Sequence, residues 1–159
     1  DIIFRLRAEI PDIVLRTTLI TGFPGETDAW HEELMEFVDE MEFDRLGVFT
    51  FSREEDTPAA AMPDQIPEAV KETRQAELME LQQEIAFDFA EDMIGREIAV
   101  MIEGRVADEN AYVGRTYMDA PGVDGLIFVN TEEELMSGDF ARVKVTGALE
   151  YDLIGELIE

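Results

Sequence analysis

A short glycine-rich segment has the residue types in this sequence that are best suited to binding a ligand. GFPGET, residues 22–27, follows a run of β-branched residues and precedes an amphipathic run. Two glycines and a proline favour a tight turn, and such a turn exposes backbone N–H groups where the next helix begins. Glu26 lies in the same segment, where it either contacts a ligand or compensates charge at the start of the helix.

The run before this segment, residues 14–21, carries polar side chains that need a partner. Because side chains alternate along a strand, Arg16, Thr18 and Ile20 share one face of it with Val14. Polar groups on the inner face of a sheet must be hydrogen-bonded, and a cavity that holds a charged cofactor would provide a partner. A salt bridge from Arg16 to a neighbouring Asp or Glu is the alternative, and the sequence leaves both open.

Phe49 belongs to a second run of alternating side chains, residues 44–52. Together with Phe51 it alternates with Val48 and Thr50. Core packing is the default interpretation of such aromatic side chains. A position that faces an adenine ring is the second interpretation of Phe49.

The sequence offers little for metal or redox chemistry. No cysteine occurs among the 159 residues, so the chain itself can form no disulfide, no thiolate zinc site and no Cys-bound iron–sulfur cluster. Its one histidine, His31, is expected at an exposed position of a helix rather than in a metal site. We therefore predict no catalytic residue and no metal ligand in this chain.

The glycine-rich segment is positioned by a predicted βαβ unit. Residues 14–21 and 44–52 have the composition of strands, and the apolar residues of 27–42 recur at helical spacing, with Thr27 as the N-cap. The two strands should be parallel neighbours with a right-handed crossover. Ligands of parallel α/β sheets bind beyond the carboxyl ends of the strands, and GFPGET occupies such an end.

The character of the sequence changes after a predicted long helix, residues 68–93, which Gly95 ends. Only short strands separated by Gly or Asn turns follow, at residues 97–106, 111–118, 125–130, 140–150 and 152–159. Five strands in fewer than 70 residues predict a small OB-like closed barrel. The predicted fold class is therefore α/β followed by all-β, with one domain at residues 1–93 and a second at 94–159.

The first domain resembles the methylthiotransferases of the radical-AdoMet family in TTLITGFPGET at 17–27, FDRLGVFTFSREEDTPAA at 43–60 and ELMELQQEIA at 77–86. The second resembles the TRAM domain of that family in RTYMDAPGVDGLIFV at 115–129 and GDFARVKVTGALEYDLIGE at 138–156. The match runs in order over essentially the whole chain, which makes it more specific than GFPGE alone. It implies the C-terminal part of a TIM-like radical-AdoMet half-barrel, followed by a five-stranded TRAM β-barrel.

The family has a branch that modifies an adenosine of transfer RNA and a branch that modifies a ribosomal protein. DRLGVFTFS, EEDTPAA and DAPGVDG look like the ribosomal-protein branch. That resemblance implies a parent enzyme that adds a methylthio group to the β-carbon of an aspartate in the twelfth protein of the small ribosomal subunit. It also implies S-adenosyl-L-methionine (AdoMet) and two 4Fe-4S clusters as cofactors.

The chain begins in a predicted helix, residues 1–9, without an initiator methionine, so we expect a piece of a longer protein. By the resemblance, the CxxxCxxC motif and the cysteines of the second cluster should lie upstream of Asp1. This piece should therefore be inactive alone.

The resemblance also implies which residues border AdoMet or the substrate aspartate. Thr18, Ile20 and Gly22 have the spacing of the G-x-I-x-G motif that binds AdoMet, although Thr18 replaces its first glycine. The acid that ends this motif would fall on Gly25, with Glu26 one step later. The implied cofactor-binding residues are Arg16, Thr18, Ile20, Gly22, Gly25, Glu26 and Phe49.

The net charge of the chain indicates which class of macromolecule it can bind. The chain carries 38 acidic and 12 basic residues, net −26, with net −17 in residues 1–92 (7 basic, 24 acidic) and net −9 in residues 93–159 (5 basic, 14 acidic). A barrel that grips transfer RNA should be basic, because phosphate neutralisation supplies most of the non-specific affinity. We therefore expect a basic ribosomal protein as the partner and no nucleic acid. The glutamates 132–134 form either a solvated turn or a contact to that partner.

No apolar run approaches the roughly 20 residues that span a bilayer, so we expect a cytoplasmic protein without a membrane partner. Two other functions stay open. One is the transfer-RNA branch of the family. The other is an acidic protein-binding adaptor without an enzymatic parent.

Overall fold

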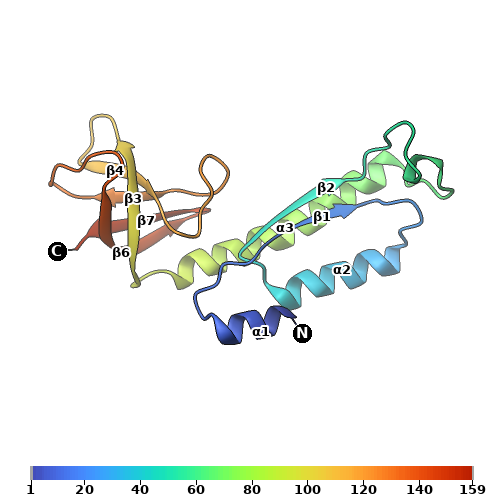
Figure 1. Cartoon of the computed structure of the whole chain (residues 1–159), viewed down its shortest axis with the longest axis horizontal. Helices are drawn as coiled ribbons and strands as arrows, with labels where there is room; N and C mark the ends of the chain where they lie inside the picture. The colour runs from blue at the N-terminus through green and yellow to red at the C-terminus, as the bar shows by residue number, and fades with distance from the viewer. Residues whose placement is uncertain (1, 159) are drawn as a thin grey trace. The chain divides into compact units, whose positions relative to one another are not determined.

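The computed structural model describes residues 2–158 of the chain. They separate into two compact units, with the division between Ile85 and Ala86 (Figure 1). This division lies inside the long helix α3, Glu68–Asp92, so each unit contains one part of that helix. The predicted domain boundary near residue 93 coincides with the end of the same helix. Among residues 2–158, no helix is long and apolar enough to cross a membrane.

The first unit contains a two-stranded parallel sheet and the helices around it. Its elements are α1 (Ile2–Glu9), β1 (Arg16–Thr21), α2 (Asp28–Met41), β2 (Arg45–Thr50), a 3-10 turn (Ala59–Ala61) and the first part of α3. β1 and β2 pair in register from Arg16 beside Arg45 to Thr21 beside Thr50. The predicted parallel strands and the helix between them are confirmed. Residue 1, which the predicted first helix includes, lies outside the described residues.

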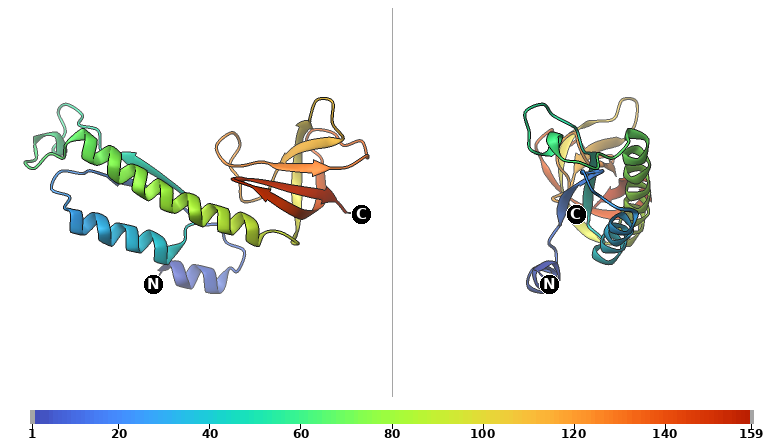
Figure 2. Two further views of the ribbon diagram at one scale, coloured as in Figure 1. Left: turned by 180° about the vertical axis from the view of Figure 1, so that it is seen from behind. Right: turned by 90° about the vertical axis from the view of Figure 1, so that its right-hand side faces the viewer.

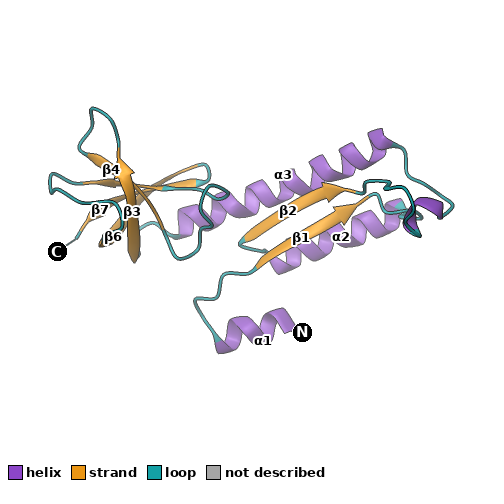
Figure 3. Cartoon of the chain, turned by 45° about the horizontal axis from the view of Figure 1, so that its top comes forward, coloured by secondary structure: helices purple, strands orange, loops and turns teal. Residues whose placement is uncertain are grey.

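Both α2 and α3 cover the same face of this sheet (Figures 2 and 3). Val38 of α2, Val48 of β2 and Leu78 of α3 form the buried centre of this layer. The partly buried side chains of Leu19, Leu34, Met35, Leu46, Leu81 and Ile85 pack around them. Because strand side chains alternate, Leu19, Leu46 and Val48 point to the helices, and their neighbours in sequence point to the other face.

Hydrogen bonds with side chains stabilise both ends of α2. The Thr27 side chain accepts a hydrogen bond from the Trp30 N–H at 3.3 Å, which confirms the predicted N-cap. At the other end Glu42 takes a left-handed conformation with φ of 44°. The Arg7 guanidinium donates to the carbonyl oxygens of Met41 and Glu42 at 2.7 and 2.8 Å. These bonds satisfy carbonyl groups that the helix leaves without a partner.

The second unit contains a closed five-stranded barrel, as predicted. Its strands are β3 (Glu97–Arg105), β4 (Ala111–Arg115), β5 (Ile127–Asn130), β6 (Phe140–Leu149) and β7 (Asp152–Leu157), in the order β3-β4-β5-β7-β6. Only β5 and β7 pair in parallel within it. Residue 159, the end of the last predicted strand, lies outside the described residues.

The barrel interior holds alternate apolar side chains of its strands. Those that are essentially inaccessible to solvent are Val100, Ile102, Ile127, Val129, Val143 and Val145. Two glycines leave the room that these side chains need. A side chain at Gly114 would collide with Val100, and one at Gly155 would collide with Val143. The barrel therefore closes around branched side chains that face strand positions without a Cβ.

Leu78 of α3 lies in the buried centre between this helix and the sheet, so the stability of the first unit should depend on it. We expect Leu78→Ala to lower the free energy of unfolding by about 2–5 kcal/mol, because it leaves a cavity in a fully buried site. Urea unfolding followed by the fluorescence of Trp30, the only tryptophan and a residue of the first unit, measures this loss. The neighbouring Met79 is 37% exposed, and Met79→Ala should cost less than about 1 kcal/mol. Equal losses for the two variants would contradict the described packing.

Candidate functional site

Four of the seven predicted cofactor-binding residues lie together on the face of the β1–β2 sheet that points away from α2 and α3. Arg16, Thr18 and Ile20 point to this face from β1, as their alternation predicts, and all three are exposed. Phe49 of β2 is the register partner of Ile20. Ile20 is 59% exposed and Phe49 is 61% exposed, so the core packing expected by default for Phe49 is not observed. A guanidinium, a hydroxyl and two apolar side chains thus share one accessible surface.

The glycine-rich segment follows directly at the carboxyl end of β1, and Glu26 organises it. One Glu26 carboxylate oxygen accepts a hydrogen bond from the Gly22 N–H at 3.0 Å. The other accepts one from the Thr21 hydroxyl at 3.2 Å. Glu26 therefore stabilises the tight turn through hydrogen bonds to the residues at its start.

The prediction that this turn exposes its backbone N–H groups is wrong at Gly22 and Gly25. The Gly22 N–H donates to Glu26, and the Gly25 N–H donates to the carbonyl oxygen of Asp64 at 3.0 Å. The physical reason is that Glu26 supplies an anion from within the chain, and a distant loop supplies a second acceptor. Gly22 and Gly25 have φ of 75° and 87°, so both use the left-handed conformation that favours glycine.

Two buried cations of α3 support the turn. Arg74 is 6% exposed, and its guanidinium donates to the carboxylates of Glu26 and Asp28, both at 2.7 Å. Burial on its own would lower the pKa of Arg74, but the hydrogen bonds and the charges of the two carboxylates outweigh it and raise this pKa. Arg74 therefore stays charged, and its stabilising effect would be lost only at strongly alkaline pH.

Lys71 lies one turn earlier on α3 and is 5% exposed. Its ammonium group donates to the Phe51 carbonyl oxygen at 2.9 Å and to Glu68 at 3.0 Å. It also lies 5.5 Å from the centre of the Phe51 ring. The side chain of Lys71 occupies the space that a Cβ at Gly22 would need.

Our sequence reasoning missed both cations. Their signal in the sequence is that Lys71 and Arg74 are the only basic residues of α3, a helix that carries many carboxylates. Their spacing of three places them on one side of the helix. Such a pair in an acidic helix indicates buried ion pairs rather than a solvated face.

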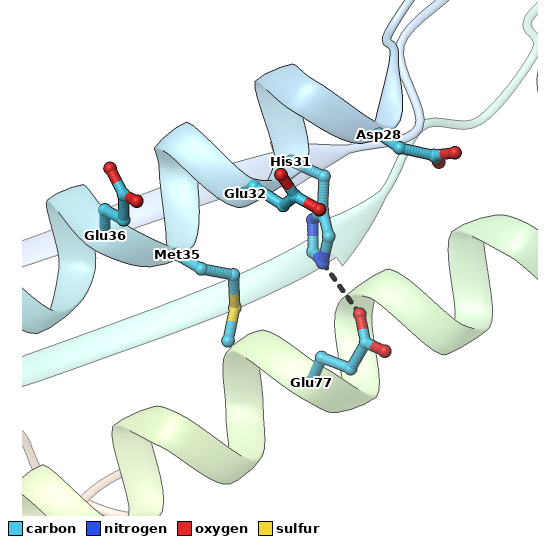
Figure 4. Close-up of a pocket in the computed structure, with 6 residues that line it drawn as sticks. All are labelled: Asp28, His31, Glu32, Met35, Glu36 and Glu77. Atoms are coloured by element: carbon cyan, nitrogen blue, oxygen red, sulfur yellow. Dashed lines mark hydrogen bonds and ion pairs between the residues drawn. The ribbon is translucent and has the colours of Figure 1, made fainter.

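The expected exposure of His31 is wrong. His31 is 7% exposed because α3 packs along α2, and its Nε2 lies 2.7 Å from a carboxylate oxygen of Glu77 (Figure 4). This pair lies in a shallow pocket whose other lining residues are Asp28, Glu32, Met35 and Glu36. Within residues 2–158, no cluster of histidine and carboxylate side chains is arranged to hold a metal ion.

The glutamates 132–134 are exposed, in a turn where the Glu133 N–H donates to the Thr131 hydroxyl at 3.0 Å. Their carboxylates make no ion pair or hydrogen bond with the residues that the structure describes. This exposure is compatible with both interpretations, a solvated turn and a contact to a basic partner.

The largely buried ion pair of Arg74 with Glu26 should contribute more to stability than an exposed ion pair. We expect Arg74→Met to lower the free energy of unfolding of the first unit by about 3–5 kcal/mol, because it leaves the buried Glu26 carboxylate without its cation. Arg142→Met removes a 3.6 Å ion pair with Glu97 in which both side chains are at least half exposed. That control should cost less than about 1 kcal/mol. Chemical denaturation of both variants is the measurement, and similar costs would refute the structural role of Arg74.

The two glycines of the turn provide a second matched pair. Gly25→Ala should cost about 1–2 kcal/mol through its left-handed backbone alone, because a Cβ there would meet no other atom. Gly22→Ala should cost at least about 1 kcal/mol more, because its methyl group would also displace Lys71. Thermal unfolding of the two variants tests this order. If Gly25→Ala were the more damaging change, Lys71 would not fill the space beside Gly22.

Comparison with known proteins agrees with this architecture. Residues 94–158 match the TRAM domain family. Ribosomal protein uS12 methylthiotransferase RimO of Lachnoclostridium phytofermentans is 64% identical over 154 residues, which are 97% of this chain and 35% of that protein. The proteins of the same name from Pelotomaculum thermopropionicum and Desulfitobacterium hafniense are 50% and 48% identical over 158 residues, 99% of this chain. The chain spans about a third of the length of these relatives. The chain is thus similar over nearly its whole length to RimO proteins, and its residues 94–158 match the TRAM domain.

Proposed function

We propose that this chain is part of an enzyme that adds a methylthio group to the β-carbon of an aspartate in ribosomal protein uS12. The observation that carries the proposal is the 64% identity to a uS12 methylthiotransferase over 97% of the chain. DAPGVDG, in the β4–β5 connection of the barrel, resembles the same branch of the family. A ribosomal substrate also makes the cytoplasm the expected location of the enzyme.

The uncovered sheet face and the turn beside it are proposed to form one wall of the AdoMet site. Arg16 and Thr18 offer a positive charge and a hydroxyl to the polar groups of AdoMet, and Ile20 and Phe49 offer an apolar surface to its adenine. Gly22 and Gly25 shape the turn at the carboxyl end of β1. In this proposal Glu26 stabilises the turn and does not contact the ligand, because its carboxylate already binds Gly22, Thr21 and Arg74. AdoMet would supply the radical chemistry and the methyl group when bound.

The proposed 4Fe-4S clusters need ligands from outside this chain. The sequence has no cysteine, and cluster iron is held by cysteine thiolates. Residues 1–93 are accordingly proposed as the part of the AdoMet domain that contributes a wall, and residues 94–159 as the TRAM domain. In this proposal neither part starts a radical by itself.

The barrel is proposed to recruit the basic protein substrate. Residues 93–159 carry 14 acidic and 5 basic side chains, net −9. A domain of that charge attracts a cationic protein over several ångströms and repels the phosphate backbone of RNA. This attraction should weaken as salt rises, because a Debye length at physiological ionic strength is only about 8 Å.

Two other functions differ in the substrate or in the chemistry. The transfer-RNA branch would require the barrel to bind RNA, which the net charge disfavours. An adaptor without an enzymatic parent would have no cluster cysteines in the longer protein. The high identity to proteins named methylthiotransferases supports an enzyme over an adaptor.

The longer protein that contains this chain provides the test. We expect the purified protein, with its clusters reconstituted and AdoMet present, to add a methylthio group to an aspartate of uS12 and to leave transfer RNA unmodified. Mass spectrometry of digested uS12 and of digested transfer RNA measures both products. A methylthio-adenosine in transfer RNA would overturn the choice of branch. Absence of CxxxCxxC from the longer sequence would support the adaptor instead.

A further inference from the structure

One apolar side chain stands out on the outer face of the barrel. Phe140, the first residue of β6, is 77% exposed. It is the register partner of Met101 on β3, and Met101 is the partner of Arg115 on β4. The Arg115 guanidinium lies 3.8 Å from the Met101 sulfur. Phe140, Met101 and Arg115 therefore form a row across three strands, because directly opposed side chains lie on one face.

The turn before β6 adds a second exposed apolar side chain to this row. Met136 is 73% exposed. Its N–H donates to the Asp139 carboxylate at 2.8 Å, and the Asp139 N–H donates back to its carbonyl at 3.0 Å. Two backbone hydrogen bonds with Ile102, from Gly138 and to Asp139, both 2.8 Å, fasten the turn to β3. The backbone that carries Met136 and Phe140 is thus fixed in the free chain, which reduces the backbone entropy lost on binding.

The cations on this face do not make it a phosphate site. Arg115 pairs with Glu103 at 3.2 Å, and Arg142 pairs with Glu97 at 3.6 Å. Lys144 lies opposite Glu97 on one side and Glu156 on the other. Each cation has a carboxylate beside it, so the strand face is close to neutral.

The connection that leads to Phe140 carries uncompensated negative charge. Glu132, Glu133 and Glu134 are exposed, and their carboxylates are without a partner among residues 2–158. Three free carboxylates and two exposed apolar side chains within nine residues fit a partner that presents basic and apolar side chains together. A nucleic acid offers neither the positive charge nor the aliphatic anchor.

We propose that Met101, Met136 and Phe140, with the glutamates 132–134, form the surface on which the barrel docks the basic protein substrate. The inference rests on the proposed function, since the occupant is taken to be uS12. Phe140 is the central anchor, because buried aromatic side chains carry most of the affinity at such interfaces. The glutamates accelerate the encounter and fix its orientation.

Binding of the 159-residue chain to purified uS12, measured by titration calorimetry, tests this surface. Phe140→Ser should weaken binding about tenfold or more. Leu149→Ser is the matched control, because Leu149 is 61% exposed at the other end of the same strand. That variant should stay within about twofold of the unaltered chain. Circular dichroism melting of both variants shows that the barrel is folded.

Binding of a lysine oligomer, which has no apolar residues, distinguishes the contribution of Phe140 from that of the charged glutamates 132–134. Phe140→Ser should leave its binding unchanged, whereas replacing the glutamates 132–134 by Gln should weaken its binding and that of uS12 and reduce their salt dependence. Equal effects of Phe140→Ser and Leu149→Ser on uS12 would overturn the proposed surface but not the function. Failure of the unaltered chain to bind uS12 would overturn recruitment by the barrel itself. Loss of self-association in Phe140→Ser, without a change in uS12 binding, would assign the surface to a second copy of this chain.

Discussion

The first unit depends on the ion pairs of Arg74 with the carboxylates of Glu26 and Asp28, of which the pair with Glu26 is largely buried. A guanidinium removed from water is tolerated only where carboxylates compensate it, and here one comes from the turn after β1 and the other from the first turn of α2. Three segments therefore have to meet around one side chain of α3. The position of the turn relative to the sheet follows from that requirement.

The same ion pairs change what the glycine-rich turn can do. A turn of this composition is expected to present its N–H groups to a ligand. In this chain Glu26 accepts the Gly22 N–H, and Arg74 holds Glu26 in that place. The turn therefore borders the uncovered sheet face and does not offer its Gly22 N–H to an anionic ligand. Lys71 also stabilises the turn, because its side chain fills the space beside Gly22.

The two units use their charges differently. In the first unit, Lys71 and Arg74 are buried and hold segments together. In the barrel, Arg115, Arg142 and Lys144 lie on the outside of the strands beside carboxylates, and the loop before β6 carries three carboxylates without a partner among residues 2–158. An acidic net charge is thus compatible with a strand face that is close to neutral and that carries the exposed aromatic side chain of Phe140. Net charge alone describes the approach of a partner and says little about where it binds.

The sequence by itself determined the order and type of the elements, because the periodicities of strands and helices are local properties. The βαβ unit, the cap at Thr27, the shared face of Arg16, Thr18 and Ile20, and the five-stranded barrel all follow from residues close together in the chain. Only the tertiary structure decided which polar side chains are buried and what they bind. His31 meets Glu77 across 46 positions, and Arg74 meets Glu26 across 48. No local pattern identifies the two partners of such a pair, since the pair forms only when α3 packs on α2 and on the sheet.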